Sequence, residues 1–152
     1  MAFIRTKNIN GKPYAYLVES VSTTKGPRQK VKKYLGRVHS FDEVNSGSFR
    51  ADNIVHNLIV SELGKYGFEY NKGSYVNGKV VFNPKTNKVV KGKKDAVVKV
   101  GEGHLSSFTV KRLVNFKKSD DVNKDATLLA KYFLEAGLNV SQEEFIEYYS
   151  GL

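Results

Sequence analysis

The segment AFIRTKNINGKPYAYLVESVSTTKGPRQKVKKYLGRV, residues 2–38, decides the fold of the first part of the chain. Its Asn10-Gly11 pair is the strongest short signal for a β-hairpin, because a type I′ turn needs a positive φ angle at both central residues. Lys25-Gly26-Pro27 marks a second, looser turn. The segment therefore predicts three antiparallel strands, at about residues 2–9, 12–22 and 28–37.

The register of the first hairpin places basic and aromatic side chains on one face of this sheet. A two-residue loop pairs Lys7 with Tyr14, and side chains alternate between the two faces of a strand. The third strand is expected to direct Val31 and Leu35 to the opposite, apolar face. The predicted nucleic-acid-binding residues on the first face are Arg5, Lys7, Tyr14, Tyr16, Arg28, Lys30, Lys32 and Tyr34.

Basic side chains interleaved with aromatic rings are typical of surfaces that bind nucleic acid, because phosphates attract the cations and bases stack on the rings. A second interpretation stays open, in which this face is solvated and tyrosine is present as a common strand residue. The salt dependence of binding distinguishes the two, since contacts to phosphates weaken steeply as salt rises.

Two longer motifs run through the same segment. Residues 3–20 match F-I-R-x-K-x-x-x-G-K-x-Y-x-Y-L-V-E-S, and residues 27–38 match P-R-Q-K-x-x-K-Y-L-G-R-V. These motifs resemble the N-terminal segment of DDE-type insertion-sequence transposases, and similar segments open small archaeal proteins. The resemblance covers about the first quarter of the chain. It implies a DNA-associated N-terminal module, and it does not extend to the catalytic domain of those enzymes.

The composition predicts a globular protein. The chain has 152 residues, of which 40% are hydrophobic and 26% charged, enough for one core or for a small module plus one compact domain. It has no cysteine, which excludes disulfides and thiolate chemistry. No apolar run approaches the roughly 20 residues of a membrane helix, and Arg5 and Lys7 interrupt any signal-peptide-like start. We therefore expect a cytoplasmic protein without a membrane partner.

Charge alternates along the chain in blocks. The net charge is +10, and such an excess favours anionic partners and fast, salt-sensitive association. Residues 1–38 and 67–118 are basic, whereas residues 39–66 and 119–152 are acidic. Any nucleic-acid surface is therefore expected to occupy one side of the protein rather than to coat it.

The remaining sequence predicts helices around an antiparallel β-meander. Helices are expected at about residues 51–66, 106–117, 123–136 and 142–149, and strands between 68 and 100 with a hairpin turn at Asn77-Gly78. Ser40-Phe41-Asp42-Glu43 has capping-box spacing and predicts one helical turn, which Ser46-Gly47-Ser48 ends. The predicted fold class is α+β, with a three-stranded antiparallel module at residues 1–38. An α+β domain at residues 39–152, with about four helices, is expected to follow and to end in two acidic amphipathic helices.

A short tract in the predicted meander forms a second basic candidate. Its members are Lys88, Lys91, Lys93 and Lys94, arranged around Gly92. One interpretation is a loop that contacts phosphates. The other is a solvated turn whose charges block unwanted pairing of an edge strand.

The two predicted C-terminal helices have helix-turn-helix spacing. A recognition helix must approach phosphates, and the second helix carries Glu143, Glu144 and Glu147 without a basic residue. We therefore favour an amphipathic lid on the core sheet over a major-groove reader. These acidic helices are also a candidate docking surface for a protein partner.

No catalytic or metal-binding set stands out in the sequence. His39, His56 and His104 are scattered, no H-x-x-x-H pair occurs, and we expect no metal, cofactor or enzymatic activity. The leading hypothesis is a non-catalytic protein that binds DNA or RNA through the basic-aromatic sheet face. The alternative is a protein–protein interaction module, in a ribonucleoprotein or mobile-element context.

Overall fold

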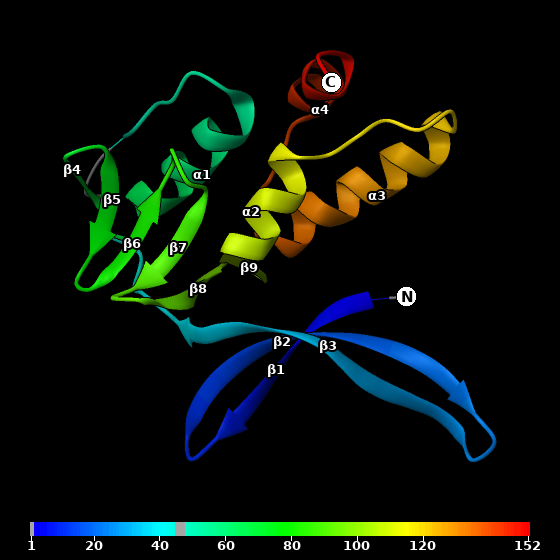
Figure 1. The fold of residues 1–152 in the computed structure, drawn as a ribbon. Coiled ribbons are helices and arrows are strands. Elements are labelled where there is room, and N and C mark those ends of the chain that lie inside the picture. Colours follow the sequence, from blue (N-terminus) through cyan, green and yellow to red (C-terminus); the bar gives the residue numbers. More distant parts are fainter. Residues whose placement is uncertain (1, 45–47) are drawn as a thin grey trace.

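The computed structural model describes residues 2–44 and 48–152, which form an α+β fold of a nine-stranded sheet and four helices (Figure 1). The strands are β1 (Ala2–Ile9), β2 (Lys12–Thr23), β3 (Gly26–His39), β4 (Glu69–Asn71), β5 (Ser74–Asn77), β6 (Val80–Asn83), β7 (Lys88–Lys91), β8 (Lys94–Val100) and β9 (Gly103–Ser106). The helices are α1 (Ile54–Lys65), α2 (Ser107–Val114), α3 (Val122–Glu135) and α4 (Gln142–Ser150). None of these four helices in the described ranges is long and apolar enough to cross a membrane.

The first hairpin forms as the sequence predicts. Asn10 and Gly11 have φ angles of 53° and 77°, so both central residues adopt the positive φ of a type I′ turn. Ile9 pairs with Lys12, and the register continues without a shift along β1 and β2. The expected antiparallel three-stranded sheet is therefore present, and both of its hairpin ends point away from the helices (Figure 1).

Strand β3 departs from the predicted alternation of faces. Its pairing with β2 shifts twice, so Tyr16 pairs with Tyr34 whereas Val18 pairs with Val31. Residues opposite each other in a pair share a face. The prediction that Val31 lies on the apolar face is therefore wrong, and its side chain is 47% exposed. The expectation for Leu35 is confirmed, since it is only 3% exposed.

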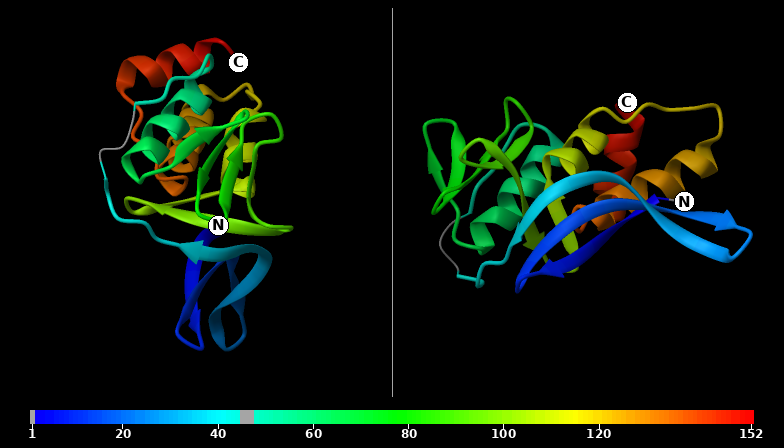
Figure 2. Two further views of the ribbon diagram at one scale, coloured as in Figure 1. Left: turned by 90° about the vertical axis from the view of Figure 1, so that its left-hand side faces the viewer. Right: turned by 60° about the horizontal axis from the view of Figure 1, so that its bottom comes forward.

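A parallel pairing of β3 with β8, which we call the seam, joins the three-stranded sheet to the rest of the molecule. Its register pairs Arg37 with Ala96, Val38 with Val97 and His39 with Val98. Gly36 precedes the seam with a φ angle of 136°, and a Cβ atom there would lie 2.7 Å from the carbonyl oxygen of Asp95. The two backbones are therefore too close for any other residue at position 36. Figure 2 shows β1–β3 as one layer beneath the meander and helices.

The meander β4 to β8 is antiparallel, with two differences from the predicted strands. The expected strand across residues 68–76 is broken by a turn at Lys72 and Gly73, which have φ angles of 49° and 88°. The next turn uses Gly78-Lys79 rather than Asn77-Gly78, because Asn77 still pairs with Val80. The hairpin was thus predicted correctly, but its loop lies one residue further along.

The connection from β3 to α1 is not helical. The capping-box spacing at residues 40–43 does not open a helical turn there, and Val44 instead bridges in parallel to Tyr66. Ser46 and Gly47, part of the predicted break, lie outside the described residues. Helix α1 begins later than predicted because Asn53, whose side chain accepts a bond from the backbone N–H of His56, is its N-cap.

The last three helices have identifiable caps. Ser106 caps α2 after the strand β9, so the helix expected at 106–117 is shorter and begins at Ser107. Gly137, with a φ angle of 81°, follows α3, and Ser141 caps α4 through a capping box with Glu144.

Asp125 of α3 is hydrogen-bonded both to α4 and to the loop between α2 and α3. It is 4% exposed and accepts bonds from the Ser119 hydroxyl at 2.7 Å and backbone N–H at 2.8 Å, and from the Tyr149 hydroxyl at 3.1 Å. The Ser119 hydrogen bonds hold the pKa of Asp125 below its usual value.

The described residues form two clusters of buried apolar side chains. The larger joins α1, the meander, α2 and α3, and includes Phe68, Phe82, Leu129 and Phe133. The smaller holds the three-stranded sheet against the body and contains Ala15, Leu35, Val38 and Val97. Leu129 and Phe133 come from α3, so the C-terminal part covers the core as a lid, as predicted.

Candidate nucleic-acid interface

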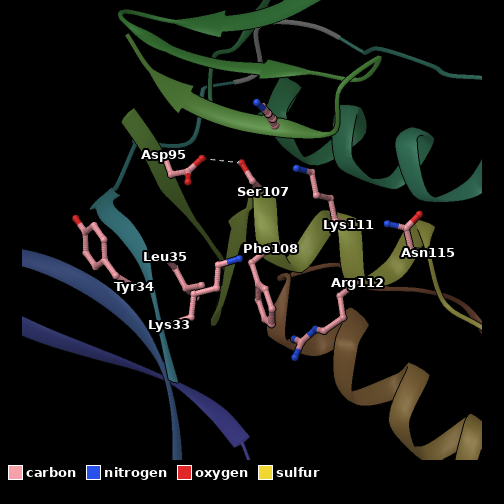
Figure 3. A pocket seen from close by; sticks show the side chains of 10 residues that line it. Lys33, Tyr34, Leu35, Asp95, Ser107, Phe108, Lys111, Arg112 and Asn115 are labelled. Atoms are coloured by element: carbon pink, nitrogen blue, oxygen red, sulfur yellow. Dashed lines mark hydrogen bonds between the residues drawn. The ribbon is translucent and has the colours of Figure 1, made fainter. Parts of the chain in front are cut away.

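Two cavities lie along the seam. The first, which we call the α2 cavity, has a volume of about 550 Å³ and lies between β3, β8 and α2 (Figure 3). The second, the tyrosine cavity, has a volume of about 470 Å³ and lies between β2, β3, β7 and β8. Tyr34 and Asp95 line both. Together these seam cavities are large enough for a small ligand or for part of a polymer.

Cations dominate the lining of the seam cavities. The α2 cavity is lined by Lys33, Lys88, Lys111 and Arg112. The tyrosine cavity is lined by Arg37, Lys91 and Lys94. Among the described residues that line either cavity, Asp95 is the one carboxylate. Three segments that are distant in sequence supply these charges, because the seam brings β3 beside β8 and α2 follows β9 directly.

Four of these lysines are free to meet an anion. Within residues 2–44 and 48–152, Lys88, Lys91, Lys94 and Lys111 enter no ion pair. A lysine that is already paired would have to break that contact before it neutralised a phosphate. These four side chains carry no such cost.

Arg112, in contrast, is held within the protein. Its guanidinium lies 3.9 Å from the ring centroid of Tyr132 and 4.8 Å from that of Phe108, and it forms an ion pair with Glu135. Lys33 also lies over Phe108, with its Nζ 5.3 Å from the ring centroid. These contacts fix the α2 wall of the cavity rather than leave Arg112 available.

Three tyrosines form a ring cluster at the edge of the tyrosine cavity. The Tyr34 ring centroid lies 5.2 Å from that of Tyr16 and 6.3 Å from that of Tyr14. Lys7 Nζ lies 5.6 Å from the centroid of Tyr16. Tyr34 is 50% exposed, so its ring is open to a stacking partner. Partial burial, with Tyr16 and Tyr14 nearby, raises the pKa of Tyr34 and keeps its phenol neutral.

His39 adds no charge to this region near neutral pH. Burial is the first cause that lowers its pKa, and the cations Lys91 and Arg37 lower it further. The positive potential of the tyrosine cavity therefore comes from its lysine and arginine side chains.

The structure brings together residues from both predicted basic sites. Tyr14 and Tyr34 line the same cavity as Lys91 and Lys94, and Lys88 lines the adjoining cavity. The predicted face and the predicted tract are thus parts of one surface. Lys93 lies at the turn between β7 and β8 and lines neither cavity.

Other predicted residues lie elsewhere. Arg28 pairs with Val21 and Lys30 with Glu19, so the register shifts place both on the opposite side of the ribbon from Tyr16. Their expected position on the tyrosine face is therefore wrong.

The remaining predicted cations of the sheet have partners within it. Lys32 forms an ion pair with Glu19 at 3.1 Å, and Arg5 donates a hydrogen bond to Gln29. Both are therefore less available to an anion than the free lysines of the cavities.

Several lining residues were not predicted from the sequence. They are Lys33, Arg37, Asp95, Ser107, Lys111, Arg112 and Asn115. Lys111 and Arg112 belong to the basic block of residues 67–118, but only the β3–β8 pairing reveals that helix α2 lies beside β3.

The described residues contain no group of three or more His, Cys, Asp or Glu side chains that could hold a metal ion. The arrangement offers cations, ring faces and one carboxylate, which is chemistry for binding an anion with aromatic parts. Comparisons with protein-family models, with curated proteins and with solved structures found no match for this chain. The resemblance of residues 2–38 to transposase segments therefore stays a prediction.

Proposed function

We propose that this protein binds nucleic acid without catalysing a reaction, and that the seam cavities are its contact surface. One observation carries the proposal: free lysines line the same cavities as the exposed ring of Tyr34. A protein binds the phosphates of a nucleic acid with cations that displace their counterions, and it binds the bases with flat rings on which they stack. A ligand with only one of these features would leave half of the surface unused.

The position of the lysines supports this proposal over the alternative in which their charges only block unwanted pairing of an edge strand. Lys91 pairs with Lys94 across the β7–β8 hairpin, and like charges directly opposite each other are unfavourable. A bound phosphate would relieve that repulsion. Lys93 lies at the exposed turn and lines neither cavity, so it fits the role of blocking edge-strand pairing better.

The test replaces the cavity lysines and follows the salt dependence of binding. Lys88, Lys91 and Lys94 are changed together to Gln, and fluorescence anisotropy measures the affinity for labelled single-stranded DNA, duplex DNA and structured RNA. We expect weaker binding to every sequence. The log–log salt slope should fall by about 0.7–0.9 for each phosphate that the variant no longer neutralises.

A matched triple variant controls for the loss of net charge. Lys79, Lys85 and Lys117 are exposed and line neither cavity, so their change to Gln removes the same charge from elsewhere. This control is expected to reduce affinity only slightly. Equal losses in the two triple variants would show that binding depends on net charge alone, and the proposed surface would then be wrong.

A further inference from the structure

Asp95 is an unexpected residue in a phosphate-binding surface. It lies among seven cations, yet within the described parts of the chain it enters no ion pair. Among the described residues, the one hydrogen bond of its side chain is accepted from the Ser107 hydroxyl at 3.3 Å, and Figure 3 shows its carboxylate directed toward that group. A carboxylate repels phosphate, so a surface that held only a phosphate backbone would bind more tightly without Asp95.

Strands on both sides hold the backbone of Asp95. Asp95 pairs with Val90 in the β7–β8 hairpin, and its carbonyl lies against Gly36 of β3. A side chain on two packed strands is positioned more accurately than one on a loop, which recognition of a base edge requires. Most of the acceptor capacity of the carboxylate stays unused, since a carboxylate offers about four acceptor positions.

The hydrogen-bonding edges of the bases differ in how well they match a carboxylate. The Watson–Crick edge of guanine presents two adjacent donors, N1–H and the N2 amino group, which match two carboxylate oxygens. Adenine and cytosine each present one amino donor beside a ring-nitrogen acceptor, and thymine and uracil present one N–H between two carbonyls. Only guanine can therefore form the bidentate contact.

We propose that the seam cavities select an unpaired guanine, with Asp95 as the residue that determines specificity. This proposal rests on the proposed function. The guanine ring stacks on the tyrosine cluster, its Watson–Crick edge donates to Asp95, and the adjacent phosphates meet Lys88, Lys91 and Lys94. Tyr34 and Asp95 line the same two cavities, so one bound nucleotide can reach both. Because that edge is used for pairing in a duplex, the preferred ligand is single-stranded.

The first experiment uses the unaltered protein. Anisotropy compares single-stranded oligothymidylates that carry one central guanine, inosine, adenine or cytosine, at a fixed salt concentration, and then the equivalent ribose series with uridine. Inosine lacks only the N2 amino group of guanine. We expect guanine to bind tighter than the other bases by about 5- to 150-fold, the range of one good bidentate contact, and inosine to lose part of that preference.

The second experiment changes Asp95→Asn, with Asp120→Asn as the matched control. Asp120 is exposed and lines neither cavity. An amide offers one donor and one acceptor, so the Asp95 variant is expected to lose its guanine preference and to bind adenine or cytosine better. The control should keep the order of the bases. The two deoxy and ribo series also establish whether the sugar is distinguished.

Four results separate the proposals. Binding that is equal for every base, or a guanine preference that Asp95→Asn leaves intact, overturns the role of Asp95 while the proposed function stands. A uniform gain of affinity in Asp95→Asn, without a change in base order, also overturns it. If no oligonucleotide binds at all, the proposed function is itself wrong.

Discussion

The substitution Gly36→Ala tests the seam directly. The added Cβ would lie 2.7 Å from the carbonyl oxygen of Asp95, 3.0 Å from its carbonyl carbon and 3.1 Å from Cα of Ala96. All three atoms belong to the backbone of β8, so no side-chain rotation relieves the contact. Strand β3 must therefore move away from β8, and the small cluster of Leu35, Val38 and Val97 must open with it.

Two terms set the size of the effect. The positive φ angle of Gly36 alone costs about 1–3 kcal/mol for a residue with a Cβ. Partial loss of the buried cluster adds to this, and removing one Leu-sized side chain from a core costs about 2–5 kcal/mol. We expect a loss of about 3–5 kcal/mol in the free energy of unfolding, measured by urea denaturation followed by circular dichroism.

Gly26→Ala is the matched control. Gly26 has a similar φ angle of 102°, but a Cβ there would meet no atom within 4 Å. This variant therefore reports the backbone cost alone, and the difference between the two variants measures the contact with β8. Equal losses of stability would refute the close approach at the seam.

Two further predictions concern stacking and pH. Tyr34→Ala is expected to weaken binding to single-stranded DNA by about 5- to 150-fold while leaving the salt slope nearly unchanged. Tyr34→Phe should keep most of the affinity. An altered salt slope in Tyr34→Ala would contradict stacking. Asp125 has a lowered pKa in the folded protein, so it stabilises the fold above its unfolded pKa of about 3.9 and loses that contribution as pH falls through the folded pKa. Asp125→Asn is therefore expected to lower the urea midpoint of unfolding at pH 7, and the difference in midpoint from the parent should shrink in acid. A difference in midpoint that persisted at low pH would argue against the hydrogen bonds from Ser119 to the charged carboxylate.

Local rules account for the first hairpin, which the sequence predicted, and for the ends of the helices. The Asn10-Gly11 turn, the Ser106 and Ser141 caps and the Gly137 stop depend on residues within a few positions of each other. The two register shifts in β3 have no such signal. They leave Leu35 and Lys32 as extra residues opposite β2, and each shift exchanges the two faces once. Tyr34, between the shifts, therefore shares a face with Tyr16, whereas residues 26–31 alternate in the opposite sense.

The candidate site was predicted in pieces for the same reason. Tyr14, Tyr34, Lys88, Lys91 and Lys94 were all recognised from charge and aromatic content, but as two separate surfaces. A parallel pairing between distant strands has no local sequence signature, so their union at the seam was not predictable. Asp95 was not predicted as a site residue because a single acidic residue in a basic tract has no distinctive sequence signal. Its importance follows only from its position in the lining of both cavities.

The parallel seam also affects the order in which the chain acquires its structure. The β1–β2 hairpin closes a two-residue loop, and such hairpins form in about 1–10 μs, whereas β3 must wait for β8 from the second half of the chain. The cavities therefore cannot form before β8 has paired with β3. A nucleic acid that contacts both sides of the seam would bind only the completed state and so would favour it by mass action. Ligand should accordingly slow the amide hydrogen exchange of Val38 and Val97 more than that of the first hairpin.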